Sequence, residues 1–184
     1  VLQTLDLRKD YGDGQGLITP LDLVVGEGEL IMLVGPNGAG KSTFLGLASG
    51  MLEPSDGWAF IGGHVAGSVP ARAALSFLPD NPVLYDDLSL SEHIEYIARL
   101  HHTQDWQEYA DDLTEMFGLS GRVDDLPSRF SRGLKQKTGL ILGLIRPFRL
   151  MLVDEPFVGL DAPGQETLVE ILSDVVEQGA TVIC

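Results

Sequence analysis

The sequence predicts an α/β fold in which a helical segment is inserted into a β-rich core. Three observations support this prediction. Residues 30–34 and 150–153 are short apolar runs with the composition of buried strands. The second run is continuous, as expected for a strand that is buried on both faces of a parallel sheet. Residues 79–121 change to a helical and acidic composition. Residues 161–178 repeat apolar side chains at helical spacing, namely Leu168, Ile171, Leu172, Val175 and Val176.

Further strands are expected in the first part of the chain. Residues 1–7 alternate well enough for an edge strand, and residues 21–25 are a second strand candidate. Residues 11–16 are rich in glycine and predict a turn that leaves Tyr11 beside a loop. Two short strands are expected near residues 58–61 and 73–78.

The inserted segment and the residues after it carry three helix signals. Ser89 and Glu92 have the spacing of a capping box, in which each side chain accepts a hydrogen bond from the other residue's backbone. A second helix is expected over residues 104–117, ended by Gly118. A third is expected over residues 131–145, started by Ser131.

The charge distribution argues against one class of partner. Residues 80–125 contain twelve Asp and Glu residues against two arginines, in a chain of net charge −15. Such a surface repels a phosphate backbone, so we expect no nucleic-acid partner. The alternative is a solvated acidic face that only aids solubility.

The composition is that of an ordinary folded domain. No apolar run reaches the roughly 18 residues of a membrane span, and residues 5–10 are too charged for a signal peptide. The single Cys184 allows no intramolecular disulfide and suits a reducing compartment. The chain begins at Val1 and stops in an apparent strand, residues 181–184, so we expect it to be a fragment truncated at its C-terminus.

A phosphate-binding loop follows the first apolar run. Residues 35–43 fit the pattern G-x-x-x-x-G-K-[ST] between a predicted strand and a predicted helix, which is the context this loop needs. Its glycines let successive N–H groups face an anion, and the helix N-terminus adds positive potential. Lys41 would reach the β- and γ-phosphates and Ser42 would bind Mg²⁺; the alternative is a glycine-rich turn with a surface lysine. The residues expected to bind the nucleotide here are Gly35, Pro36, Asn37, Gly38, Ala39, Gly40, Lys41, Ser42 and Thr43.

Two acids follow the second apolar run. Asp154 would lie at the carboxyl edge of the sheet, where ligands of open α/β folds bind and where its oxygen could hold Mg²⁺ through water. Glu155 is placed to orient or deprotonate an attacking water, so it is the catalytic candidate. The alternative for both acids is a helix cap or a solvated turn.

These residues, taken together, resemble the nucleotide-binding domain of an ABC transporter. The resemblance covers nearly the whole chain. It is carried by Tyr11, residues 35–43, Pro79-Asp80, residues 131–136, residues 151–156 and residues 159–161. It implies one ATP-binding domain over residues 1–184, of the P-loop NTPase type with an antiparallel β subdomain. Residues 1–79 and 147–184 would form the core and β subdomain, and residues 80–146 a helical subdomain ending in the signature helix.

The resemblance also implies roles for residues outside the phosphate loop. Tyr11 matches the aromatic that stacks on adenine; the alternative is a packed loop tyrosine. Ser131 and Gly133 match the signature that binds the γ-phosphate of ATP held by a second copy. The alternative, favoured if the family resemblance is set aside, is a plain helix N-cap. Asp161 matches a loop that crosses the same interface. A head-to-tail homodimer with ATP between its subunits follows from these roles.

Three departures from the family pattern stand out. The signature is Phe-Ser-Arg-Gly-Leu-Lys-Gln rather than Leu-Ser-Gly-Gly-Gln, a variant that resembles the drug- and polymer-exporter branch. Asp80 stands where the family usually has a Gln that touches Mg²⁺ or the water, so it is a third candidate metal ligand. The family's switch histidine would lie beyond Cys184, and no histidine of this chain matches it: His64, His93, His101 and His102 are interpreted as surface or core residues.

The leading functional interpretation is the ATP-hydrolysing subunit of a membrane exporter. It would bind ATP and Mg²⁺, pair with a second nucleotide-binding domain, and dock on a separate permease at the cytoplasmic face of the membrane. Two alternatives remain at this point: a soluble ABC ATPase without a transport role, and a fragment that binds ATP without turnover.

Overall fold

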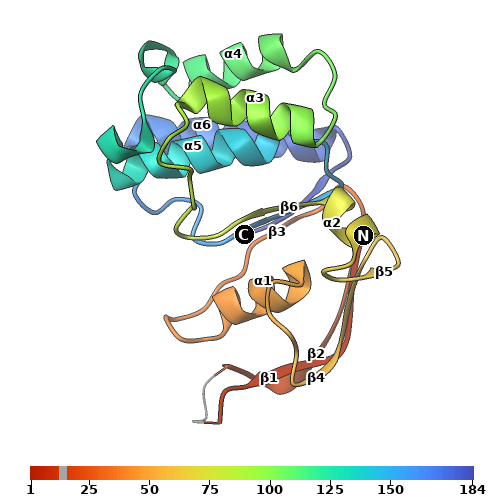
Figure 1. Ribbon diagram of the computed structural model, residues 1–184. Helices are drawn as coiled ribbons and strands as arrows, with labels where there is room; N and C mark the ends of the chain where they lie inside the picture. Colours follow the sequence, from red (N-terminus) through yellow and green to blue (C-terminus); the bar gives the residue numbers. More distant parts are fainter. Residues whose placement is uncertain (13–15) are drawn as a thin grey trace. The chain divides into compact units, whose positions relative to one another are not determined.

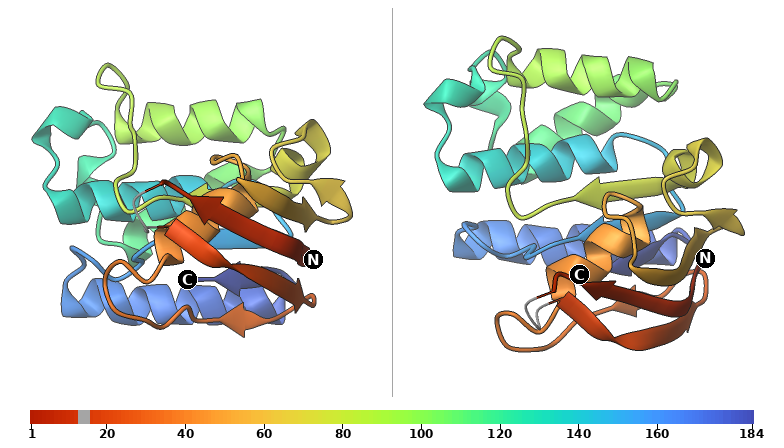
Figure 2. Two further views of the ribbon diagram at one scale, coloured as in Figure 1. Left: turned by 90° about the horizontal axis from the view of Figure 1, so that it is seen from below. Right: turned by 60° about the horizontal axis from the view of Figure 1, so that its bottom comes forward.

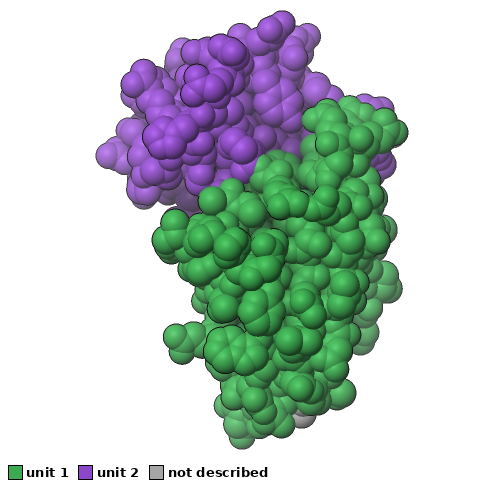
Figure 3. Space-filling model, turned by 90° about the vertical axis from the view of Figure 1, so that its right-hand side faces the viewer, with its two compact units in different colours: residues 1–77, 148–154, 174–184 green, residues 78–147, 155–173 purple. Residues whose placement is uncertain are grey.

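A computed structural model describes residues 1–12 and 16–184, which divide into two compact units (Figure 3). Unit 1 comprises residues 1–77, 148–154 and 174–184, and unit 2 comprises residues 78–147 and 155–173. The predicted turn over residues 11–16 falls partly outside the described residues.

The first sheet of unit 1 is antiparallel and has the order β2-β1-β4-β5. Leu2 on β1 pairs with Val25 on β2 and with Ile61 on β4, so β1 is an inner strand. The prediction of an edge strand was therefore wrong, because alternation shows that one face is buried but not how many neighbours a strand has. The bounds are β1 Leu2–Asp10, β2 Gly16–Val25, β4 Asp56–Ile61 and β5 His64–Val65.

The second sheet has the order β3-β8-β7-β6, and β8 pairs in parallel with both β3 and β7. Every residue of β7 is buried, as the apolar run predicted. The helix α1 lies between the two sheets (Figures 1 and 2), and its Phe44, Leu45 and Leu47 share one core with residues of both. The bounds are β3 Leu30–Ile31, α1 Lys41–Ser49, α2 Val69–Ala74, β6 Leu75–Leu78, β7 Leu150–Val153 and β8 Thr181–Ile183.

The strand before the phosphate loop is less buried than predicted. β3 is the end strand of its sheet among the described residues, and Leu30, Met32 and Val34 are exposed by 47%, 62% and 90%. Only Ile31 and Leu33 pack against the core. One face of this run is therefore exposed where a buried strand was expected, because no described segment packs on it.

Unit 2 is helical. The capping box is confirmed at the start of α3: Ser89 N–H donates to Glu92 Oε2 at 2.7 Å, and Glu92 N–H donates to Ser89 Oγ at 3.3 Å. Both α3 and α4 pack against α5 (Figure 1). The bounds are α3 Leu90–Leu100, α4 Trp106–Met116, α5 Arg132–Leu144 and α6 Ala162–Glu177, with the short 3₁₀ turns η1 Ser120–Arg122 and η2 Pro127–Arg129.

The two compact units do not coincide with the expected domain boundaries, which stay a prediction. Residues 155–173 were expected in the core, but they group with the helices. Contacts within unit 2 give the reason: Thr167 Oγ1 donates to the Met116 carbonyl, and Lys137 pairs with Asp161. Residues 78–79 and residue 147 also fall in the helical unit rather than in the core.

Candidate nucleotide-binding site

The phosphate loop of unit 1 has the backbone that its glycines predict. Gly38 and Gly40 have φ of +82° and +90°, a region that a side chain disfavours. Gly40 is the N-cap of α1, and no side chain caps this helix N-terminus in its place. The first turn of α1 also contains no acid. The loop therefore presents a helix N-terminus whose positive potential no side-chain cap or first-turn carboxylate offsets, which favours an anion.

The two functional side chains of the loop leave from the first turn of α1. Lys41 Nζ donates to the carbonyl oxygens of Gly35 and Pro36 at 2.9 and 3.4 Å, so its charge is held against the loop's own backbone. Ser42 is exposed at the next position. An ammonium and a hydroxyl at a helix N-terminus fit the phosphates and the cation of a nucleotide.

Tyr11 lies beside this loop, because Gly16 is close to both Gly40 of the loop and the Tyr11 ring. A Cβ on Gly40 would come within 3.3 Å of the Gly16 carbonyl oxygen, and a Cβ on Gly16 would come within 3.0 Å of the Tyr11 ring. The Tyr11 side chain is half exposed, and Lys9 Nζ lies 5.6 Å from its ring centroid. Tyr11 is thus an accessible ring at the hairpin that touches the phosphate loop, which suits a base-stacking role.

Asp154 shares a sheet edge with the phosphate loop. Because β3 and β7 both run parallel to β8, the residues that follow them emerge at the same edge, about 10 Å apart as next-nearest strands. Asp154 is only 8% exposed. A hydroxyl and a carboxylate oxygen are the hard ligands that Mg²⁺ takes, so Ser42 and Asp154 fit this ion.

Glu155 has an unusual backbone conformation. It follows Asp154 in the chain, belongs to unit 2, and has φ of +51°, in the left-handed region that non-glycine residues seldom adopt. Its carbonyl accepts from Val158 N–H at 3.1 Å, which closes a turn. Strained residues of this kind cluster at functional sites, because the surroundings must hold a side chain in place there.

In unit 2, the signature residues lie at the N-terminus of α5. Ser131 caps this helix by accepting from Leu134 N–H at 3.3 Å. Gly133 lies against the turn that follows Glu155: a Cβ there would come within 2.2 Å of the Gly159 carbonyl oxygen. Lys137, one turn further on, pairs with Asp161 at 2.8 Å, and this hydrogen bond holds the pKa of Asp161 below its usual value. The turn that contains Gly159 and Asp161 therefore packs along the first two turns of the helix that Ser131 caps.

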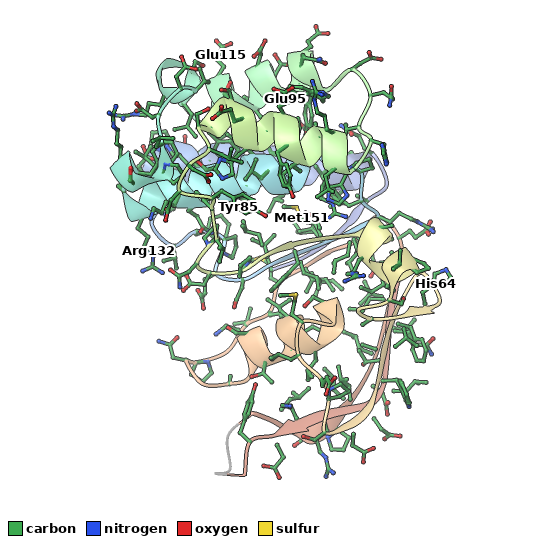
Figure 4. The ribbon with its side chains drawn as sticks, in the orientation of Figure 1. His64, Tyr85, Glu95, Glu115, Arg132 and Met151 are labelled. Carbon is green, nitrogen blue, oxygen red and sulfur yellow. The ribbon has the colours of Figure 1, made fainter. Side chains whose placement is uncertain are left out.

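Asp80 has partners that the sequence interpretation missed. Its Oδ1 accepts from Arg132 Nη2 at 2.8 Å and its Oδ2 accepts from Asn81 Nδ2 at 2.9 Å. Arg132 lies at the first position of α5 (Figure 4). The expected role of Asp80 as a metal ligand stays a prediction. The sequence contains one indication of this pair: Asp80 and Arg132 both replace uncharged residues of the family pattern, and their charges are opposite.

The histidines have varied surroundings. His64 and His102 are exposed. Burial is the main cause that lowers the pKa of His101. His93 is 2% exposed, with Nδ1 at 2.8 Å from the Ser89 carbonyl oxygen and Nε2 accepting from Tyr85 N–H at 2.9 Å. His93 therefore ties the segment after Asp80 to α3, a role more specific than that of a core filler.

Two features are absent from the described residues. No group of three or more His, Cys, Asp and Glu side chains is arranged to hold a metal ion there. No helix in that part of the chain has the length and apolar character needed to cross a membrane.

Comparison with known proteins decides the family. The family model described as ABC transporter matches residues 18–158, which include the phosphate loop, Asp80, the signature and Asp154-Glu155. The chain belongs to the ABC transporter family. As an ABC transporter ATP-binding subunit, it is part of a family whose ATP hydrolysis is coupled to transport.

Individual relatives agree with this assignment. The ABC subunit is 32% identical to the SkfA peptide export ATP-binding protein SkfE of Bacillus subtilis, over 98% of its own length and 76% of the relative's. It is 29% identical to the linearmycin resistance ATP-binding protein LnrL of the same organism and spans 60% of that chain. A solved structure titled ATP binding subunit of ABC transporter matches all of it with a TM-score of 0.90 and 31% identity, over 78% of that chain.

Proposed function

We propose that this chain binds Mg-ATP at residues 35–43 with Tyr11 and Asp154, and that Glu155 drives hydrolysis to power an exporter. The observation that carries the proposal is the shared sheet edge: the phosphate loop and Asp154 follow strands that run parallel to the same strand β8. Ligands of open α/β folds bind at that edge.

Each residue has a defined task in this proposal. The N-terminus of α1 and the ammonium of Lys41 attract the phosphates, while Tyr11 stacks on the base. Ser42 and Asp154 hold Mg²⁺, which supplies positive charge at the phosphate oxygens. Glu155 orients the attacking water and accepts its proton, a task for which its carboxylate must be ionised.

Two copies are needed to complete the proposed site. Ser131 and Gly133 lie at the N-terminus of α5 in unit 2, a place that favours an anion, and the family resemblance assigns them to the nucleotide of a second copy. Closure of the homodimer on ATP would then bring the signature of one copy onto the γ-phosphate of the other. Asp161, held by Lys137 beside the signature, would lie at the same interface.

Export is the proposed direction of transport. The signature variant favours it, and the relatives SkfE and LnrL are described by peptide export and antibiotic resistance. The chain would act at the cytoplasmic face of a membrane through a separate permease, with unit 2 as the docking part. Cytoplasmic loops of membrane proteins are rich in Lys and Arg, so the acidic helices are complementary to them.

The first experiment is equilibrium ATP binding with and without Mg²⁺, comparing the unmodified chain with Lys41→Ala and Glu155→Gln. We expect Lys41→Ala to abolish binding and Glu155→Gln to retain it. Turnover should be lost in both variants. Binding that survives Lys41→Ala would overturn the assignment of the loop, and binding without turnover by the unmodified chain would favour the nucleotide-binding alternative.

The docking proposal has its own test. Asp111, Asp112 and Asp124 are exposed, whereas Asp125 already accepts from Arg122 and Arg129. Replacing the first three by Asn should weaken co-purification with the permease and make what remains less sensitive to salt. Asp125→Asn should have a smaller effect. Co-purification that keeps both its strength and its salt dependence would exclude the acidic docking surface, whereas no co-purification of the unmodified chain with a permease would favour a soluble ABC ATPase.

A further inference from the structure

The Asp80–Arg132 ion pair lies at the proposed signature site and joins two segments that are 52 residues apart in the chain. Arg132 stands between Ser131 and Gly133, the two residues assigned to the γ-phosphate of a second copy. Its side chain is 59% exposed and that of Asp80 is 34% exposed. The guanidinium is therefore accessible from solvent at the place where a phosphate is expected.

The N-terminus of α5 has an excess of positive charge. Arg132 and Lys135 lie in its first turn, and this turn contains no acid. Cations at a helix N-terminus are unfavourable because the helix dipole is positive there. The Asp80 carboxylate offsets part of this charge, although one of its oxygens is shared with Asn81.

The segment that contains Asp80 is fixed to the same face of α5. A Cβ on Gly139, two turns after Arg132, would come within 2.7 Å of both Leu78 and Pro82. Gln136, which lies between them on this face, is only 2% exposed. Residues 78–82 therefore lie along α5, and Asp80 is held within reach of Arg132 by packing as well as by charge.

We propose that Arg132 exchanges partners at this site: it pairs with Asp80 in the open protein and with the γ-phosphate of the second copy's ATP in the closed dimer. The inference rests on the proposed function, since it requires a nucleotide at the signature. A phosphate carries more charge than a carboxylate and offers three oxygens to the planar guanidinium, so it is the stronger acceptor. Asp80 thus competes with ATP for Arg132 and raises the ATP concentration needed for closure.

The exchange also has a consequence for residues 78–82. When Arg132 turns to the phosphate, the Asp80 carboxylate loses its ion-pair partner at the start of α5. The nucleotide state of the signature is thereby transmitted to this segment, and through Tyr85 N–H and His93 to α3.

The test measures ATP-driven dimerisation of the full chain in a Glu155→Gln background by sedimentation. We expect Asp80→Asn to lower the ATP concentration for half-maximal dimer about two- to fivefold, the range for an exposed ion pair. Arg132→Gln should raise it about tenfold or more, because a charge-assisted contact to phosphate is lost. The double variant should match Arg132→Gln alone, since Asp80 has no effect without its partner. The ATP concentration for half-maximal dimer of Arg132→Lys should lie between those of the parent and of Arg132→Gln. Arg132→Lys takes the place of Arg132→Gln if the latter variant fails to fold.

Glu95→Gln is the matched control. It removes the same charge from an exposed ion pair of unit 2, Arg99–Glu95 at 2.5 Å, and should leave dimerisation unchanged. Two results would overturn the exchange. One is an effect of Asp80→Asn that persists in the Arg132→Gln background, and the other is an increase, rather than a decrease, in the ATP concentration that Asp80→Asn needs to dimerise. Absence of any ATP-dependent dimer in the parent would instead overturn the proposed function, and the exchange with it.

Discussion

Among single residues, Glu155 combines a proposed catalytic role with a backbone that opposes its presence. A left-handed conformation costs a residue with a Cβ about 1–2 kcal/mol. Glycine adopts this conformation without strain, as Gly159 does with φ of +80°. A glutamate at this position therefore costs stability, which is typical of functional positions.

Two truncations of Glu155 measure this cost. Both Glu155→Ala and Glu155→Gly remove the side chain, but only Gly adopts a φ of +51° without strain. We expect the Gly variant to have a free energy of unfolding about 1 kcal/mol higher than the Ala variant in urea denaturation. The opposite order, usual where φ is negative, would show that the turn relaxes after substitution.

Glu92 is the second residue whose environment gives a measurable effect. Its pKa is lowered mainly by the hydrogen bond from Ser89 N–H, and further by the Ser89 hydroxyl. Its contribution to stability is therefore complete above the usual glutamate pKa and is lost as pH falls through the lowered, folded value.

Glu92→Gln removes the titration and retains the capping hydrogen bond. The stability of the unmodified protein should fall relative to this variant as the pH is lowered below the usual glutamate range, in thermal melts at a series of pH values. As a control, Ser89→Ala should cost about 1 kcal/mol at neutral pH. A constant difference between Glu92→Gln and the unmodified protein at every pH would contradict the assigned role of Glu92.

Among elements, α5 connects the proposed functional segments of unit 2. One face, with Gly133 and Lys137, meets the turn at Gly159 and the Asp161 carboxylate. A second face, with Arg132 and Gly139, meets residues 78–82. Glycines inside a helix normally lower its stability, so their presence on both faces indicates that close approach matters more here than helix propensity.

Alanine substitutions at the two glycines test this arrangement. Ala favours a helix by about 1 kcal/mol over Gly, yet Gly133→Ala places a Cβ 2.2 Å from a backbone oxygen. Both Gly133→Ala and Gly139→Ala should therefore lower the free energy of unfolding by about 1–3 kcal/mol. Gly121→Ala, where a Cβ would meet nothing within 4 Å, is the control and should be near neutral. A gain in stability from either substitution would mean that the neighbours of that glycine move aside.

For the whole molecule, sequence patterns predicted the motifs and the helices better than the neighbours of each strand. The glycine-rich turn into α1, the capping box and the buried strand β7 depend on local residues, and the structure confirms these three features. The inner position of β1, the exposed face of β3 and the Asp80–Arg132 pair depend on contacts between distant segments. A pattern of apolar and polar residues carries no information about such contacts.

The net charge of −15 also acts on the molecule as a whole. Self-repulsion among carboxylates disfavours the compact state and is screened by salt. The melting temperature at neutral pH should therefore rise when NaCl is increased from about 0.01 M to about 0.15 M, where the Debye length falls to about 8 Å. A melting temperature that falls over this range would mean that the ion pairs, rather than the excess of acids, dominate the electrostatic free energy.

The free edge of β3 has a consequence for handling the protein. On one side, Ile31 and Leu33 share hydrogen bonds with Cys184. On the other side, no strand among the described residues pairs with β3. Leu30 in β3, and Met32 and Val34 after it, are exposed. An apolar strand with an open edge recruits other chains by strand addition, without nucleotide and without a defined stoichiometry. Met32→Lys should suppress such aggregates, so that any association in the sedimentation profile is the one proposed to depend on ATP.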